Sequence, residues 1–181
     1  MFSYAINEAI KICLIEERHA EEFFALVQKN WERLLDWYPW LDEVETLEKT
    51  RGFIRGKLQR FADSNGFTAG FFEHEVLIGV IALEYIDWSN QITEIGYWLS
   101  AETEGQGLIS QACPILIEYA FRQLKMNRVQ IRCASENWRS RAIPEKLGFK
   151  PEGLIRQAEK LPDRFVDLVV YGMLADEWKP I

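Results

Sequence analysis

A turn that contains two glycines offers the clearest chemistry in this sequence. Within the segment Gly96–Ile109, Gly105 and Gly107 separate a strand-like apolar run from a helical one. Glycines let the backbone turn tightly, so several N–H groups can converge on one anion, and the start of a helix adds partial positive charge there. The sequence therefore predicts a site for a pyrophosphate. The alternative, that the glycines serve turn geometry alone, stays open because a G-x-G pair is a weak motif.

The same turn disfavours two common nucleotide sites. The dinucleotide fingerprint G-x-G-x-x-G is incomplete, and the preceding strands resemble a meander rather than the start of a parallel unit. A triphosphate loop would need a G-K-[ST] sequence, and none follows these glycines.

A second segment, Glu136–Phe149, carries side chains that could bind the same ligand. Asn137 is expected at the end of a strand, and Ser140 in the first turn of the following helix. Both residue types also cap helices by accepting hydrogen bonds from exposed N–H groups. Capping and ligand binding are therefore both open for Asn137 and Ser140 when each is considered alone.

The hydrophobic pattern places these segments in a series of strands and helices. Strands are predicted at residues 10–15, 67–72, 76–86, 91–99, 128–134, 149–160 and 166–174. The first strand is followed by an amphipathic helix with a buried stripe of Phe24, Val27, Trp31, Leu34 and Leu35. Further helices are predicted at residues 46–61, 107–124 and 138–147, the first of them with Leu47, Ile54, Leu58 and Phe61 on its apolar stripe. Pro114 removes one helical hydrogen bond and predicts a kink or a late helix start.

This order predicts one mixed α/β domain over residues 1–181, with a mostly antiparallel sheet of about seven strands and about four helices. The strand at 128–134 is expected to lie parallel to the strand at 91–99 across a helical crossover. A length of 181 residues is enough for one core and short for two. The chain has neither an apolar run of about 18 residues nor a signal-peptide pattern at Met1–Ala9, which favours a cytoplasmic protein without membrane contact.

Metal chemistry and disulfides are not expected. Cys13, Cys113 and Cys133 are odd in number and lack C-x-x-C spacing, so buried free thiols are predicted. His19 and His74 have no Cys, His or Asp at ligand spacing.

Charge is distributed unevenly along the chain. The net charge is −7, yet residues 122–150 hold 8 Lys and Arg against 2 Asp and Glu, while residues 1–121 hold 9 against 20. An acidic chain disfavours nonspecific nucleic-acid binding. The basic segment would attract a polyanionic cofactor and the acidic remainder would favour a cationic acceptor, although a basic solvated helix face gives the same pattern.

Together the two segments resemble the GNAT acetyltransferases, and more closely their RimJ/RimL branch, which acetylates N-terminal amines of ribosomal proteins. The glycine turn is similar to the family's pyrophosphate loop, and the pattern N-x-x-S followed by L-G-F is matched by Asn137, Ser140, Leu147, Gly148 and Phe149. Trp37–Trp40, Asp167–Tyr171 and Glu177–Trp178 also resemble that branch. The resemblance covers most of the chain, and the order and spacing of these loose motifs make it specific.

The resemblance implies the GNAT acyl-CoA N-acyltransferase fold, with acetyl-CoA (coenzyme A) as cofactor. Its cleft would open between the family's fourth and fifth strands, here residues 91–99 and 128–134. Backbone groups of Leu99 and Ala101 would hold the pantetheine, Asn137 would contact the same arm, and Ser140 would lie close to the sulfur. The pyrophosphate would bind at Gly105, Gln106, Gly107, Leu108, Ile109 and Ser110. A homodimer is compatible with the resemblance.

Three positions depart from the family pattern. Glu104 stands where many members have Gln or Arg, so backbone donors would carry the phosphate binding. Ile109 replaces a small residue and is expected to join the core. Pro144 replaces the tyrosine that protonates the departing thiolate in much of the superfamily, and the RimL-like branch then implies Ser140 as the proton donor.

Amine acetylation requires a neutral amine, a stabilised oxyanion and a protonated thiolate. A peptide α-amine has a pKa of about 7.7–8.0, so a modest base suffices. Glu94 is the candidate base, because strand alternation puts it on the face of Gly96 and Trp98, where apolar neighbours raise a carboxyl pKa. A salt-bridged or solvent-facing Glu94 is the alternative. A backbone N–H near Leu99 is expected to stabilise the oxyanion.

Trp37, Tyr38 and Trp40 resemble the acceptor-side wall of the RimL-like branch, and ordinary core filling is the alternative. The predicted function is transfer of an acetyl group from acetyl-CoA, through a ternary complex, to the N-terminal α-amine of a ribosomal or other protein. Two alternatives remain at this stage: acetylation of a polyamine or aminoglycoside, and a noncatalytic acyl-CoA sensor.

Overall fold

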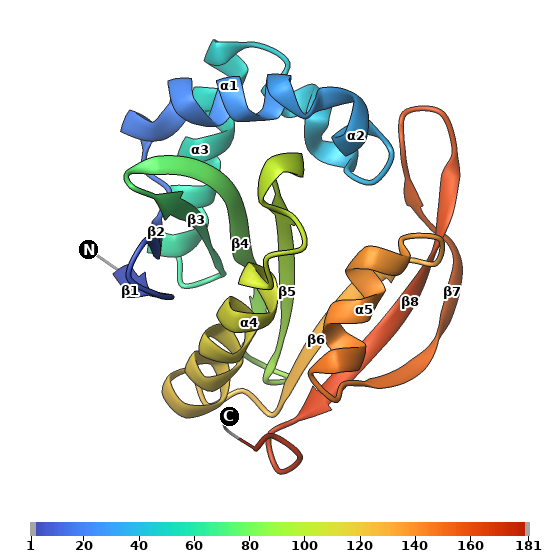
Figure 1. The fold of residues 1–181 in the computed structure, drawn as a ribbon. Helices are drawn as coiled ribbons and strands as arrows, with labels where there is room; N and C mark the ends of the chain where they lie inside the picture. The colour runs from blue at the N-terminus through green and yellow to red at the C-terminus, as the bar shows by residue number, and fades with distance from the viewer. Residues whose placement is uncertain (1–2, 180–181) are drawn as a thin grey trace.

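The fold is built on one sheet of eight strands. The computed structural model describes residues 3–179, and Figure 1 shows the sheet running through the molecule with helices on both sides. In chain order the strands are β1 (Ser3–Ala5), β2 (Ile10–Leu14), β3 (Phe67–Glu73), β4 (Val76–Asp87), β5 (Ile92–Leu99), β6 (Arg128–Ala134), β7 (Lys150–Lys160) and β8 (Phe165–Leu174). Their spatial order is β1-β2-β3-β4-β5-β6-β8-β7.

β5 and β6 are the one parallel pair among the described strands, as the sequence predicts. They pair only where Ile92–Glu94 meets Arg128–Gln130. Further along, β5 stays with β4 as far as Leu99, and β6 stays with β8 as far as Ala134. The two strands therefore separate at their carboxyl ends, and Figure 1 shows β5 and β6 diverging there.

Five α-helices lie within the described residues. They are α1 (Ala20–Lys29), α2 (Trp31–Leu35), α3 (Leu47–Ala62), α4 (Leu108–Glu118) and α5 (Trp138–Lys146). α1, α2 and α3 pack on one face of the sheet, and α4 and α5 pack on the other (Figure 1). Each face has its own apolar core, with Phe23 and Leu34 buried under the first group and Leu116 and Ile131 under the second.

The predicted first helix is interrupted at Asn30. The helical periodicity continues through this residue, but Asn30 takes a non-helical φ of −110° between α1 and α2. Its buried amide donates to Leu26 O at 2.9 Å, and its Oδ1 accepts from Ala101 N at 2.9 Å. Asn competes with helical hydrogen bonds in this way. At this break, the side chain of Asn30 holds the segment that follows β5 by binding Ala101.

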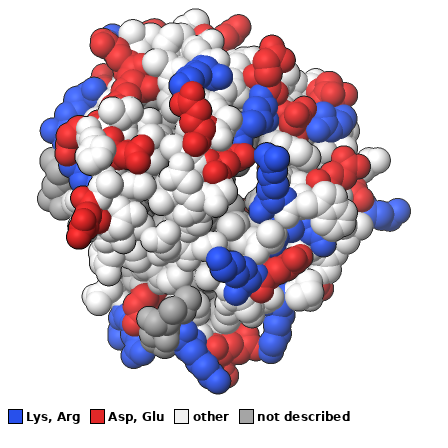
Figure 2. Space-filling view, viewed as in Figure 1, with Lys and Arg blue, Asp and Glu red and all other residues white. Residues whose placement is uncertain are grey.

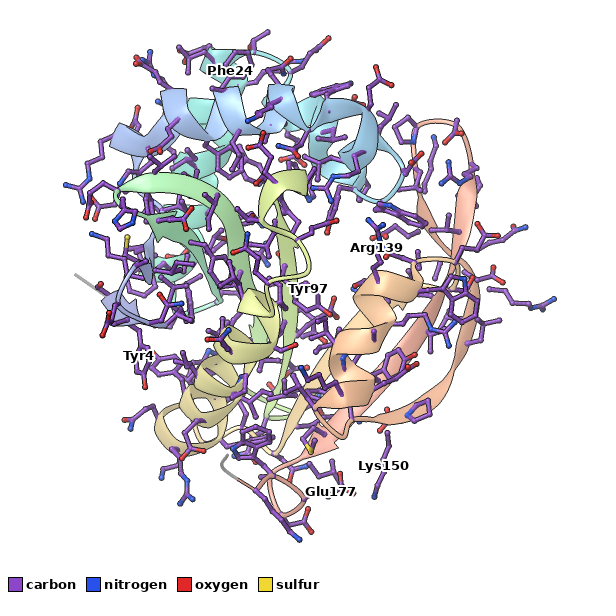
Figure 3. The ribbon with its side chains drawn as sticks, in the orientation of Figure 1. Tyr4, Phe24, Tyr97, Arg139, Lys150 and Glu177 are labelled. Atoms are coloured by element: carbon purple, nitrogen blue, oxygen red, sulfur yellow. The ribbon has the colours of Figure 1, made fainter. Side chains whose placement is uncertain are left out.

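Two predicted core aromatics point outward. Phe23, 1% exposed, lies in the core where Phe24 was expected, and Figure 3 shows Phe24 on the outer side of α1. One step along a helix rotates a side chain by about 100°, so adjacent phenylalanines leave the phase ambiguous. Phe61, in the last turn of α3, is 43% exposed. Periodicity gives the direction of a stripe but not how far the core extends along it.

Pro114 does not delay its helix, because α4 begins at Leu108, six residues earlier. The helix predicted over residues 107–124 is α-helical only as far as Glu118. Residues Tyr119–Gln123 make a π-helical turn, in which Leu124 N donates to Tyr119 O at 3.1 Å.

β1 is one strand more than the seven that the sequence predicts. Its three residues pair with β2 in antiparallel register, Ser3 opposite Cys13, and a run this short carries no periodic signal. The three cysteines are buried and free, as predicted. Within residues 3–179, every helix is too short or too polar to cross a membrane.

Gly79 on β4 should be intolerant of any side chain. A Cβ at this position would lie 2.4 Å from Trp98 O and 2.8 Å from Leu99 Cα, both on β5. We expect Gly79→Ala to lower the free energy of unfolding by about 1–3 kcal/mol, because β5 must shift. Denaturant unfolding measures the change.

Gly52→Ala is the matched control, since Gly52 lies within α3 and a Cβ there would meet nothing within 4 Å. We expect this change to stabilise the protein by about 0.5–1 kcal/mol. Equal effects of the two substitutions would contradict the close approach of β4 and β5.

Candidate active site

Two connected chambers open where β5 and β6 separate. The larger chamber, about 750 Å³, lies between β5, the loop that follows it and α5. The smaller chamber, about 270 Å³, lies on the face of the sheet covered by α1 and α3. Figure 2 shows a hollow in this region, bordered by basic side chains on the side of α5.

The two chambers share part of their walls. Six residues line both: Trp37, Tyr38, Tyr97, Trp98, Asn137 and Ser140. A ligand in one chamber can therefore meet a ligand in the other at this junction.

The glycine turn forms one end of the larger chamber. Gly105 and Gly107 have φ values of 77° and 76°, a left-handed conformation that glycine adopts without strain. α4 starts directly after Gly107, so its first-turn N–H groups lie beside the turn. The turn thus has the backbone geometry that the predicted anion site requires.

Most of the predicted cofactor residues line the larger chamber. They are Leu99, Ala101, Gly105, Gly107, Leu108, Ile109, Ser110, Asn137 and Ser140. Gln106 does not line it; its exposed side chain instead donates to Glu102 O at 3.4 Å. Ile109 is 8% exposed and packs in the core under α4, as expected.

The backbone of β5 presents polar groups to the gap. Ser100 N donates to Ile78 O of β4 at 2.8 Å. Because backbone groups alternate in direction along an antiparallel strand, the N–H and C=O groups of Tyr97 and Leu99 face away from β4, towards the gap. There Tyr97 O accepts from Tyr38 Oη at 2.8 Å, and Leu99 O accepts from Arg33. The N–H of Ala101 is already bound to Asn30, so it is not free for the pantetheine contact that the resemblance implies.

Glu104 does not oppose an anion as strongly as its charge suggests. Its carboxylate pairs with Arg33 of α2, and with Nη1 of Arg139 of α5 at 3.1 Å. Figure 3 shows Arg139 near the start of α5, facing the gap. With Lys146, three cations and one carboxylate line the larger chamber. A glycine turn, a helix start and an excess of cations together fit a diphosphate.

Ser140 lies at the junction and is held by its neighbours. Asn137 caps α5, since its Oδ1 accepts from Ser140 N at 3.0 Å. Tyr97 Oη donates to Ser140 O at 3.0 Å, and Ser140 Oγ lies 3.2 Å from Cys133 Sγ. Capping and ligand contact are therefore compatible, because the cap leaves the Asn137 Nδ2 and the Ser140 Oγ available.

Burial keeps the groups around Ser140 protonated. It raises the pKa of Tyr97 well above its usual value, and it raises the pKa of Cys133 to about 11. Sequence reasoning singled out neither residue as part of the site. Tyr97 and Cys133 can therefore act there as neutral hydrogen-bonding groups.

Aromatic side chains form much of the smaller chamber. Trp40 lies between Phe53, at a ring distance of 5.5 Å, and Tyr38, also at 5.5 Å. Trp37 lines the chamber as well. The three predicted acceptor-side aromatics thus all line this chamber, and Tyr38 and Trp40 are also packed against the core under α1–α3.

Glu94 is buried in the smaller chamber but is not free. Its Oε2 accepts from Arg132 Nε at 2.7 Å and from Gln130 Nε2 at 2.8 Å. The salt-bridged alternative from the sequence is the arrangement present. Glu84 on the neighbouring strand β4, which sequence reasoning missed, lies over Gly96 and pairs with Lys57 Nζ at 3.0 Å.

Glu159 is a further carboxylate of the smaller chamber that sequence reasoning missed. It lies on β7, an edge strand that is otherwise almost wholly exposed. Burial, and to a lesser extent Glu94, raises the pKa of Glu159 above its usual range, while Arg132 acts in the opposite direction. Alternation along β7 gave no signal for Glu159, because the register of the strand shifts twice before this residue, between Pro151 and Gly153 and between Ile155 and Glu159.

The comparisons with known proteins agree with this geometry. Residues 11–150 match the acetyltransferase (GNAT) domain model. The chain belongs to the GNAT acetyltransferase family.

Among its relatives, the chain is 39% identical over 180 residues to the putative ribosomal N-acetyltransferase YdaF of Bacillus subtilis, covering 99% of this chain and 98% of that protein. It is 32% identical over 173 residues to the ribosomal-protein-serine acetyltransferase of Escherichia coli, covering 94% and 96%. The solved structure of a ribosomal α-N-protein acetyltransferase, RimL, in complex with coenzyme A superposes with a TM-score of 0.92 at 26% identity, covering 98% of this chain and all of that one. The chain is thus an N-acetyltransferase that uses acetyl-CoA.

Gly107 should matter for the cofactor as well as for the fold. A side chain at φ 76° costs about 1–2 kcal/mol, and relaxing the turn would move the N–H groups at the start of α4. We expect Gly107→Ala to weaken acetyl-CoA binding by about tenfold or more, the effect of losing one hydrogen bond to a charged group. Isothermal titration calorimetry measures the affinity.

Gly148→Ala is the control. Gly148 has a similar φ of 80°, follows α5 and lines neither chamber. We expect Gly148→Ala to lower the free energy of unfolding about as much as Gly107→Ala does, and to leave the affinity for acetyl-CoA unchanged. If both variants bind acetyl-CoA equally, the glycine turn is not the phosphate site.

Proposed function

We propose that this protein acetylates the N-terminal α-amine of a protein, and that a ribosomal protein is the acceptor. The observation that carries the proposal is a pair of chambers of opposite charge that meet at Ser140. Three cations and one carboxylate line the larger chamber, and three carboxylates and two cations line the smaller one. An anionic cofactor and a cationic amine are therefore each attracted to a different side of the same junction.

The relatives support this acceptor class. The Escherichia coli relative is named a ribosomal-protein-serine acetyltransferase. A solved acetyltransferase from Salmonella typhimurium, 26% identical with a TM-score of 0.87, is described as modifying the N-terminal serine of a 50S ribosomal subunit protein. The smaller chamber suits such a substrate, because the aromatic wall at Trp40 and Phe53 can enclose the first side chain of a peptide.

Acetyl-CoA supplies the acetyl thioester in this reaction. The glycine turn and the start of α4 hold its diphosphate, and the edge of β5 at Leu99 holds its extended arm. The Leu99 N–H is turned towards the gap, where it is placed to stabilise negative charge on the acetyl oxygen.

Proton transfer is assigned to two residues on opposite sides of the junction. Glu159 removes a proton from the ammonium group, and a carboxyl whose pKa is raised by burial is better matched to this task. Ser140 Oγ donates its proton to the departing thiolate and takes one in return from the nitrogen of the tetrahedral intermediate, with Cys133 and Tyr97 fixing the position of the serine. Glu94 instead holds Arg132 in place, since two donors already occupy its Oε2.

The pH dependence of turnover tests these assignments. Glu159 acts when it is ionised, so kcat should fall as the pH drops through its raised pKa. We expect Glu159→Gln to lower kcat by about 10²–10⁴-fold and to abolish this acidic limb. Ser140→Ala should lower kcat while leaving the acidic limb in place.

Glu94→Gln is the matched control for Glu159→Gln. It should retain the acidic limb, because the base is still present, although Arg132 loses an ion pair. The opposite result, a lost limb in Glu94→Gln and a normal profile in Glu159→Gln, would restore Glu94 as the base.

An acceptor panel tests the proposed substrate class. We expect kcat/KM to be at least about tenfold higher for peptides with a free N-terminal serine than for polyamines or aminoglycosides, because only a peptide extends along the aromatic wall. The same peptides with a blocked N-terminus and a free lysine serve as controls. Preferred turnover of the small amines would contradict the proposal, and tight acetyl-CoA binding without any acceptor-dependent thiol release would contradict catalysis itself.

A further inference from the structure

β7 reaches the smaller chamber through an irregular pairing with β8. Ile155 pairs with Leu168, and the next paired residue, Glu159, lies opposite Val166. Four steps along β7 therefore correspond to two steps along β8, so β7 carries two extra residues in this interval. Such a bulge bends a strand and redirects the side chains that follow it.

Gln157 is the residue that makes the bulge turn. Its φ is 48°, a left-handed value that non-glycine residues rarely adopt. A bulged residue also leaves its N–H without a partner on the neighbouring strand. A conformation of this kind persists when the surroundings hold it in place.

Asp167 on β8 supplies that support. Its Oδ1 accepts the hydrogen bond from Gln157 N at 2.8 Å. Its backbone carbonyl accepts from Ser135 N, also at 2.8 Å, in the turn between β6 and Asn137. One residue thus connects the bulge that carries Glu159 with the turn that leads to Ser140.

We propose that Asp167 is a positioning residue: by binding the Gln157 N–H it holds the bulge that directs Glu159 into the smaller chamber. This inference rests on the proposed role of Glu159 as the base. Asp167 touches neither substrate in this arrangement and acts through the backbone of β7.

The hydrogen bond can be separated from the charge of Asp167. The charged groups that face Glu159 are Arg132 of β6 and Glu94 of β5, and both remain when Asp167 is replaced. Asparagine keeps an oxygen that accepts the Gln157 N–H and removes the charge, whereas alanine removes both. The pair Asp167→Asn and Asp167→Ala therefore distinguishes geometry from electrostatics.

The test compares kcat and its pH profile in these variants. We expect Asp167→Ala to lower kcat by about tenfold or more, since small misplacements of a reacting group are costly, while KM for acetyl-CoA stays within about twofold. Its acidic limb should move to lower pH, because a less buried Glu159 loses the cause of its raised pKa. Asp167→Asn should retain most of the activity with an unchanged limb.

Two further variants complete the design. Gln157→Gly in the Asp167→Ala background should restore part of kcat, because glycine adopts the left-handed turn without support. Asp176→Ala removes an exposed carboxylate beyond the far end of β8 and should change nothing. Hydrogen exchange at the Gln157 amide gives a readout independent of catalysis, with faster exchange expected in Asp167→Ala alone among the single variants.

The outcomes separate the two proposals. A normal rate and acidic limb in folded Asp167→Ala, or equal losses in Asp167→Asn and Asp167→Ala, would overturn the positioning role. Normal turnover in Glu159→Gln would instead remove Glu159 as the base, and the amide exchange would still report whether Asp167 holds the bulge.

Discussion

β5 and β6 cannot share a ladder beyond Glu94 and Gln130, and most of the site depends on this separation. Backbone polar groups that lose a neighbouring strand must find other partners. Here Tyr38 and Arg33 cover the carbonyls of Tyr97 and Leu99, and a buried Asn30 binds the N–H of Ala101. The gap that remains is lined by main-chain groups and by the starts of α4 and α5, both suited to an extended anionic ligand. The cleft between β5 and β6 is thus a consequence of where one parallel pairing ends.

Charge is organised around the junction. Glu104 holds Arg33 and Arg139 across the mouth of the larger chamber without cancelling its positive excess. In the smaller chamber Arg132 and Lys57 neutralise Glu94 and Glu84, whereas Glu159 forms no ion pair with any residue between 3 and 179 to set against its burial. A carboxyl left in that position is the one that an incoming ammonium can approach most favourably. Structural ion pairs therefore engage two of the three carboxylates and leave Glu159, the proposed base.

The hairpin of β7 and β8 joins the two halves of the site. Its bulge carries Glu159, and Asp167 ties that bulge to the turn before α5. Arg164, near the tip of the hairpin, donates to the carbonyl of Asp36, the residue after α2, at 3.0 Å. Although β7 is the exposed edge of the sheet, it contributes a side chain to the interior. Edge strands can do this where a bulge changes the direction of their side chains.

The sequence by itself determined the local features: the order of strands along the chain, the parallel crossover, the glycine turn before α4 and the Asn137 cap. These follow from periodicity and from backbone conformations that only particular residues favour. It left the ion pair of Glu94 open as an alternative, and it did not predict the interruption at Asn30, the burial of Phe23 in place of Phe24 or the position of Glu159. Each of these depends on partners that are remote in the chain, such as Ala101 for Asn30 and Arg132 for Glu94. Only tertiary packing brings such partners together, because a hydrogen bond or a charge pair across the fold leaves no pattern in the residues next to either partner.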